Sequence, residues 1–174
     1  AGLEKGRDMP RRSRLPVRGR CVPSLAPAHL SMKPSHSTPL SRYLTRRPEA
    51  TPAHLTSYLE EGASLVSTAD LVALAGLLPE LDAKIARITE SERFRHRLET
   101  LALYFHETTH DAPERREAAF ALYYFLKGYD LVPDNVPHVG LLDDALLVEA
   151  AVNRNVHALR AHWAARGRVW PAGL

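Results

Sequence analysis

The sequence predicts an all-α protein, a single-domain bundle of five or six helices that follows a disordered N-terminal tail. Apolar residues recur at helical spacing from residue 51 onwards, whereas no stretch of useful length alternates as a β-strand does. No internal repeat is visible. A chain of 174 residues that is 45% hydrophobic and 25% charged has the size and composition of one domain with one core.

Residues 1–50 are rich in proline, arginine and serine and show no sustained periodicity. This composition cannot bury enough apolar surface to offset the entropy of ordering, so we predict a disordered tail over residues 1–50 and a helical domain over residues 51–168. Met9 and Met32 are both candidate starts, and we expect Met32 to be the natural one. A genuine basic arm that touches acidic partners is the alternative.

The basic character of the chain belongs to the tail. Residues 1–31 carry seven Lys and Arg against two Asp and Glu, a charge of +5, which leaves −2 of the total +3 for the rest. The helical domain therefore has no excess of basic residues that could bind phosphates, and we expect no nucleic-acid partner.

Cysteine usage and hydropathy indicate where the protein is located. Cys21 is the only cysteine, which excludes an internal disulfide and a multi-cysteine zinc site and fits a reducing compartment. No apolar run approaches the ~18–20 residues needed to span a bilayer, and the N-terminus lacks a secretory signal. We expect a cytoplasmic protein without a transmembrane helix, or one peripheral to the inner membrane.

The first helices are indicated by their end signals. Thr51 and Pro52 form a good N-cap and first-turn proline, and Gly62 stands where a C-cap glycine belongs. A single apolar stripe follows, at spacings of three and four: Leu71, Leu74, Leu78, Leu81, Ile85 and Ile88. Pro79 interrupts this stripe, which leaves either a kinked helix or two helices that meet at Leu78.

Two further helices precede the most distinctive segment. Ser91 caps a helix whose apolar face is made by Phe94, Leu98, Leu101 and Phe105. Asp111 with Glu114 is a capping-box variant that opens a helix running to Lys127. Residues 118–126 are apolar all round, which predicts that this helix is central and buried.

We expect one last helix, beginning near Gly140. Its inward stripe is Leu141, Ala145, Val148, Val152, Val156, Leu159 and Trp163. Trp163 therefore belongs to the core, whereas the position of Trp170 stays open.

A connector with two prolines joins the two best helices. Pro133 and Pro137 fix φ and bias the preceding residues toward extended backbone, while Gly140 permits an unusual dihedral angle or a close approach. Asp143 and Asp144 fall in the first turn of the next helix, where the helix dipole favours carboxylates. The connector is therefore predicted to be a rigid corner.

The run from Tyr129 to Asp144 resembles the signature of the YkvA-like domain of unknown function (DUF 1232). The matching positions are Asp130, Leu131, Pro133, Asp134, Pro137, Gly140, Asp143 and Asp144. Tyr129 and Asn135 depart from the usual Ile and Phe, and the resemblance covers residues 113–150. It implies a helical domain of mostly bacterial and archaeal proteins without an established activity. Many members are thought to sit at membranes through a hydrophobic segment that this sequence lacks.

The acidic cluster of this signature allows two interpretations. Asp130, Asp134, Asp143 and Asp144 could converge on Mg²⁺ or Ca²⁺, or bind a basic partner. Alternatively, they cap helix ends and accept hydrogen bonds from backbone N–H groups around a tight corner. We predict the structural role, with no cofactor.

Residues 106–110 match the zinc-protease pattern His-Glu-x-x-His, with His106, Glu107 and His110. On a continuous helix this spacing places two imidazoles one turn apart and a glutamate beside a zinc-bound water. Pro113 follows too closely for the helix to continue, and Asp111 occupies a place that is usually uncharged in these enzymes. We therefore predict a solvent-facing helix end and no metal.

Two classes of function follow from these observations. The first, which we prefer, is a non-catalytic helical module that binds an unknown protein partner or a membrane surface. The second is a metal-dependent hydrolase that uses either His106, Glu107 and His110 or the acidic cluster.

Overall fold

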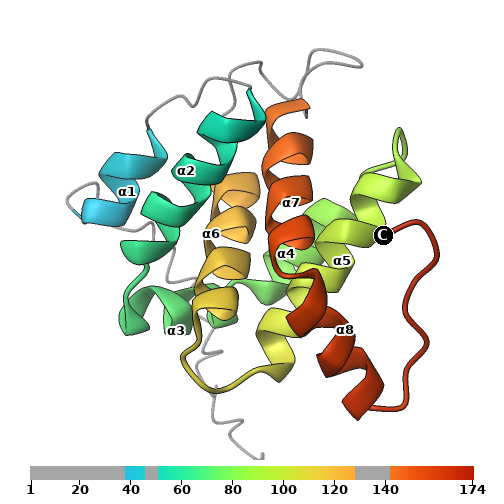
Figure 1. The fold of residues 1–174 in the computed structure, drawn as a ribbon. Coiled ribbons are helices and arrows are strands. Elements are labelled where there is room, and N and C mark those ends of the chain that lie inside the picture. Colours follow the sequence, from blue (N-terminus) through green and yellow to red (C-terminus); the bar gives the residue numbers. More distant parts are fainter. Residues whose placement is uncertain (1–37, 46–50, 128–141) are drawn as a thin grey trace, which may run out of the picture. The chain divides into compact units, whose positions relative to one another are not determined.

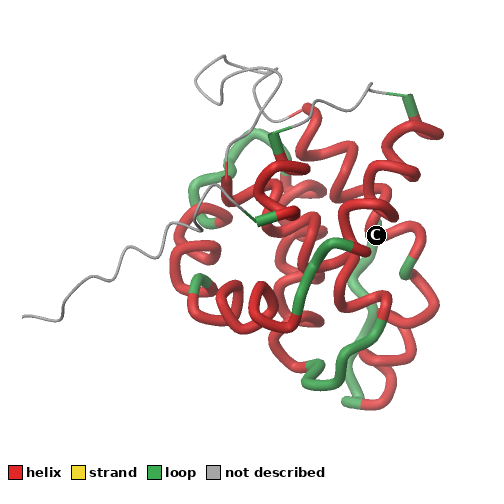
Figure 2. The backbone as a smooth tube through the Cα atoms, turned by 90° about the vertical axis from the view of Figure 1, so that its left-hand side faces the viewer, coloured by secondary structure: helices red, strands yellow, loops and turns green. Residues whose placement is uncertain are grey.

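The structure, a computed structural model, describes residues 38–45, 51–127 and 142–174. These residues form eight helices and no strand (Figures 1 and 2). The predicted all-α class is confirmed, whereas the predicted number of five or six helices was too low. The helices are α1 (Pro39–Leu44), α2 (Pro52–Ser64), α3 (Thr68–Gly76), α4 (Leu78–Ile85), α5 (Glu92–Glu107), α6 (Pro113–Lys127), α7 (Leu142–Arg154) and α8 (Val156–Ala165).

Helix α6 is the centre of the bundle. It packs against α2, α5 and α7, and also contacts α3 and α4 (Figure 1). Every residue from Ala118 to Phe125 is at most 3% exposed. The prediction of a central helix that is apolar all round is therefore confirmed.

Helix α1 lies within residues 1–50, which the sequence predicted to be a disordered tail. Thr38 caps it by accepting a hydrogen bond from the Ser41 backbone N–H (3.1 Å), and Leu40, Tyr43 and Leu44 are buried. Tyr43 stacks on Tyr58 of α2 at 4.8 Å between ring centroids. The described part of the predicted tail is therefore a helix that belongs to the core. Six residues are too few to produce a periodic signal in the sequence. The rest of the predicted tail lies outside the described residues.

Gly62 is not a C-cap, because α2 continues to Ser64 and is capped at Leu65. A Cβ atom at residue 62 would lie 2.2 Å from Cζ of Phe120 on α6. The glycine is therefore required for the close approach of α2 to α6, and the predicted helix end was wrong.

Of the two alternatives left by Pro79, the structure shows two helices. Helix α3 ends at Gly76 and α4 begins at Leu78, so the break lies at Leu77, one residue earlier than expected. Pro79 stands in the first turn of α4, where the missing N–H has no intrahelical partner to lose.

Ser91 caps α5 as predicted, accepting a hydrogen bond from the Phe94 backbone N–H (3.2 Å). The capping box predicted at Asp111 is wrong, because α6 begins at Pro113 and Ala112 precedes its first residue. The Asp111 carboxylate instead accepts two hydrogen bonds from the Arg116 guanidinium, at 2.7 and 2.6 Å.

The predicted last helix is two helices, α7 and α8, which meet at Asn155. The Asn155 side chain donates to the carbonyl of Ala151 (2.9 Å) and to the carboxylate of Glu117 (2.8 Å), so a side-chain amide occupies the break. The apolar stripe runs across this break, with Val152, Leu159 and Trp163 all buried. Because the spacing is undisturbed, the sequence pattern does not show the break.

No helix within the described ranges is long and apolar enough to cross a membrane.

Candidate functional site

The acidic signature is described only in part. Asp130, Pro133, Asp134, Pro137 and Gly140 lie outside the described residues. Asp143 and Asp144 are described, in the first turn of α7 as predicted, and are 5% and 0% exposed. They are therefore part of the protein interior.

Asp143 is bound by a tyrosine of the central helix. The Tyr124 hydroxyl donates a hydrogen bond to Oδ2 of Asp143 (3.0 Å), and both residues are buried. Burial, followed by the charge of Asp143 and this hydrogen bond, raises the pKa of Tyr124 well above its usual value. The phenol therefore stays protonated and acts as a donor. Asp143 and Asp144 each make at least one further interaction.

This geometry suits a structural role for the described part of the signature. Two carboxylates in the first turn of a helix lie where unpaired backbone N–H groups and the helix dipole stabilise negative charge. Tyr124 adds a hydrogen bond from a second helix and also packs edge-to-face on Tyr58, at 6.0 Å between centroids. The acidic turn thus joins α7 to α6 inside the core.

The zinc-protease pattern is divided by the end of a helix. Helix α5 ends at Glu107, and Thr108 is extended, with φ −94° and ψ 111°. His106 is therefore the only histidine of the pattern that lies in the helix, and His110 does not lie one turn further along the same face. Both histidines are exposed. The described stretches contain no group of three or more His, Cys, Asp or Glu residues that could hold a metal ion.

Glu107 is bound by three basic side chains, which with it form what we call the Glu107 cluster. Arg168 makes two hydrogen bonds to the carboxylate, at 2.6 and 2.8 Å. Nε of Arg166 and Nε2 of His162 each lie 2.9 Å from Oε2. The hydrogen bond from Arg168, with lesser help from His162 and Arg166, lowers the pKa of Glu107 to about 2. Such a carboxylate is a poor general base.

His162 is held from both sides of its ring. Nε2 faces Glu107, Nδ1 lies 3.0 Å from a guanidinium nitrogen of Arg166, and the ring packs edge-to-face on Tyr104 at 5.0 Å. These contacts match the tautomer with its proton on Nε2, which donates to Glu107 and accepts from Arg166. His162 is therefore a structural member of the cluster.

A second ionic network joins α2, α6 and α7. Arg154 donates to both carboxylate oxygens of Glu117, at 3.1 and 3.2 Å, and also pairs with Glu60 at 2.7 Å. Glu117 is only 9% exposed, and the amide of Asn155 completes its hydrogen bonds.

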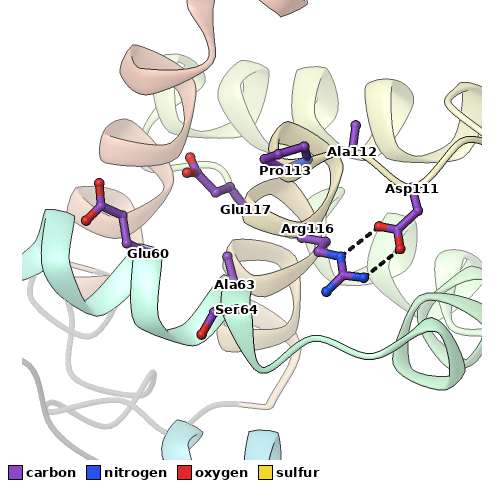
Figure 3. A pocket seen from close by; sticks show the side chains of 8 residues that line it. All are labelled: Glu60, Ala63, Ser64, Asp111, Ala112, Pro113, Arg116 and Glu117. Atoms are coloured by element: carbon purple, nitrogen blue, oxygen red, sulfur yellow. Dashed lines mark hydrogen bonds and ion pairs between the residues drawn. The ribbon is translucent and has the colours of Figure 1, made fainter.

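A cavity of about 400 Å³ lies beside this network (Figure 3). Its wall is formed by the end of α2 and the start of α6 and includes Glu60, Glu117 and Arg116. Figure 3 shows Arg116 turned toward Asp111, with which it makes its two hydrogen bonds. Because Arg154 binds both Glu60 and Glu117, the charged groups of this wall are paired within the protein.

The sequence did not indicate several of these contacts. Tyr124 lies in an apolar run, and its only signal is that a buried tyrosine hydroxyl needs a hydrogen-bond partner. Arg166 and Arg168 are about sixty positions from Glu107, and no local pattern joins them.

The fold and the acidic turn define a class of protein: a helical bundle with two buried carboxylates at the start of one helix, the first of which accepts a hydrogen bond from the central helix. The model of the family described as "Protein of unknown function (DUF1232)" matches residues 115–150. This range contains the whole signature from Asp130 to Asp144, so the predicted resemblance to this family is confirmed there. Neither a curated protein nor a solved structure matches the chain.

Proposed function

We propose that this protein is a non-catalytic helical module that binds a protein partner. The observation that carries the proposal is the outward face of α3. Ala69, Val72, Ala73, Ala75 and Gly76 are all exposed there, and Val72 is 69% exposed. The only charged residue of α3, Asp70, is held in the capping box with Ser67. An exposed surface depleted of charge is typical of the centre of a protein interface.

The composition of α3 favours a protein partner over a membrane surface. Helices that lie on anionic membranes carry Lys and Arg along their polar face. Helix α3 contains neither, and Glu80 follows it on the exposed start of α4. An exposed face of small residues suits close packing by another helix.

The two chemical alternatives receive less support from the described residues. The glutamate of the zinc-protease pattern is bound by two arginines, and the described aspartates of the signature are buried. For this reason we prefer the binding module over the hydrolase.

Site-specific photocrosslinking tests the proposal. A photoreactive amino acid replaces Val72 in one variant and Val169 in the other, and the full-length proteins are expressed in their native cells. Val169 is a matched control because it is also an exposed valine, at 91% exposure, but lies far along the chain from α3. We expect a defined crosslinked protein at position 72, and we expect the purified partner to lose binding to the Ala73→Lys variant.

Two results would count against a protein partner on α3. The first is an identical set of crosslinks at positions 72 and 169. The second is co-sedimentation with phosphatidylserine vesicles that is abolished by Ala73→Glu, since this would assign the face to a membrane.

A further inference from the structure

The segment after α8, residues 166–174, follows α5 along its length in the opposite direction; we call it the strap. Gly167, with φ +65°, ends α8 in a Schellman motif: the Arg168 N–H bonds the carbonyl of Trp163 and the Gly167 N–H that of Ala164, both at 3.0 Å. This motif reverses the chain. Arg168 then meets the end of α5 at Glu107, and residues 172–174 reach its start beside Glu92. Figure 1 shows this returning segment in dark red.

The strap covers an apolar face formed by α5 and α8. Trp170 packs edge-to-face on Trp163 at 5.7 Å, and the guanidinium of Arg160 lies 5.6 Å above the Trp170 ring. Pro171 lines a cavity together with Thr100, Leu103 and Trp163. Trp163 is 5% exposed. Without the strap, this face would be open to solvent.

The strap makes ionic contacts at one end and leaves cavities between itself and α5 beyond them. Arg166 and Arg168 both bind Glu107, as described above. Beyond that point Val169 is 91% exposed, and cavities of about 300 and 280 Å³ lie between α5 and the strap. The buried Nε1 of Trp170 finds no hydrogen-bond partner in the described part of the chain. Poor packing and an unsatisfied polar atom are features of segments that open at low cost.

We propose that the strap is a latch: Glu107 keeps it closed, and loss of the Glu107 ion pairs lets it swing about Gly167 and uncover the α5–α8 face. Glu107, the glutamate of the zinc-protease pattern, then serves to hold the strap in place. Its two arginines are partly exposed, with side chains 36% and 40% accessible, so solvent and competing anions can reach them. The proposal concerns a different face from α3 and does not depend on the proposed function.

Cysteine labelling tests whether the strap opens. Cys21 is replaced by Ser, and Leu103→Cys places a thiol beneath the strap in the full-length protein. The rate of maleimide labelling then reports how often that face is uncovered. Two variants release the latch, Glu107→Gln and Arg168→Gln. Asp111→Asn is the matched control, because it removes an equivalent two-bond carboxylate–arginine pair elsewhere on the surface.

We expect Glu107→Gln and Arg168→Gln each to label at least about fivefold faster than the parent, in keeping with the loss of partly exposed ion pairs. The double variant should label no faster than Glu107→Gln, since the two residues act through one contact. Asp111→Asn should label at the parental rate.

The proposal is overturned if both latch variants label at the parental rate. It is also overturned if Asp111→Asn accelerates labelling as much as they do, since general loosening of the fold would then be the cause. Circular dichroism melting of each variant separates these outcomes, because general loosening would lower the melting temperature of Asp111→Asn as much as that of the latch variants.

Discussion

The hydroxyl of Tyr124 donates a 3.0 Å hydrogen bond to the carboxylate of Asp143, between the central helix and the first turn of α7. Both side chains are buried, and the carboxylate belongs to the family signature. One carboxylate of the acidic motif is thus engaged by a tyrosine inside the core. The contact shows how an acidic sequence pattern can serve the fold.

Tyr124→Phe should destabilise the protein by about 1.5–3 kcal/mol, the range for losing a hydrogen bond to a charged group when the charge stays buried. Urea unfolding followed by circular dichroism measures this loss. Tyr123→Phe is the control, because the Tyr123 hydroxyl donates to a neutral acceptor, the carbonyl of Asp70, at 2.6 Å. That change should cost only about 0.5–1.5 kcal/mol. Equal losses for the two variants would show that Asp143 does not depend on Tyr124.

Gly62→Ala should destabilise the protein although alanine is the better helix former. The added Cβ would lie 2.2 Å from Phe120, a contact that α2 and α6 must relieve by separating. Overpacking of this kind costs about 1–3 kcal/mol, which exceeds the roughly 1 kcal/mol gained in helix propensity. Gly76→Ala is the control, since no atom lies within 4 Å of its added Cβ. Recovery of stability in Gly62→Ala with Phe120→Leu would attribute the loss to this contact, and no recovery would contradict it.

The helices of this protein were predictable where they bury a regular stripe. The start of α5 and the burial of α6 follow directly from Ser91 and from an unbroken apolar run. The break at Asn155 was not predictable, because it preserves the spacing of the apolar residues on both sides. Gly62 was misinterpreted for a different reason: glycine marks both helix ends and close helix contacts, and only the position of Phe120 distinguishes them.

The candidate sites were predictable only where their contacts join residues that are close in the sequence. The first-turn position of Asp143 and Asp144 follows from the glycine and apolar residues around them. The partner of Glu107 does not, since Arg168 reaches it from a distant part of the chain through a Schellman turn at Gly167. Ion pairs between distant segments depend on the complete fold, and a single sequence carries no trace of them.

The latch should resist acid down to low pH. Arg168 and its neighbours lower the pKa of Glu107 from 4.5 to about 2. A lowered folded-state pKa means that ionised Glu107 stabilises the fold above pH 4.5, and that this contribution is lost as pH falls toward 2. The free energy of unfolding of the parent should therefore exceed that of Glu107→Gln at pH 6, and the difference should vanish near pH 2. A difference that stays constant over this range would contradict the ionic role of Glu107.

Metal content distinguishes the binding module from the hydrolase. The helix ends between His106 and His110, and Glu107 is bound by arginines, so we expect no stoichiometric zinc in protein purified without a histidine tag. Elemental analysis for zinc, magnesium, calcium and manganese measures this directly. Zinc that disappears in His106→Ala would restore the hydrolase interpretation and would require Glu107 to leave its arginines. Calcium or magnesium that is lost in Asp134→Ala but retained in His106→Ala would instead place a cation at the acidic signature. In that case Tyr124→Phe should change the affinity for the cation, because its hydroxyl is bonded to one of the signature carboxylates.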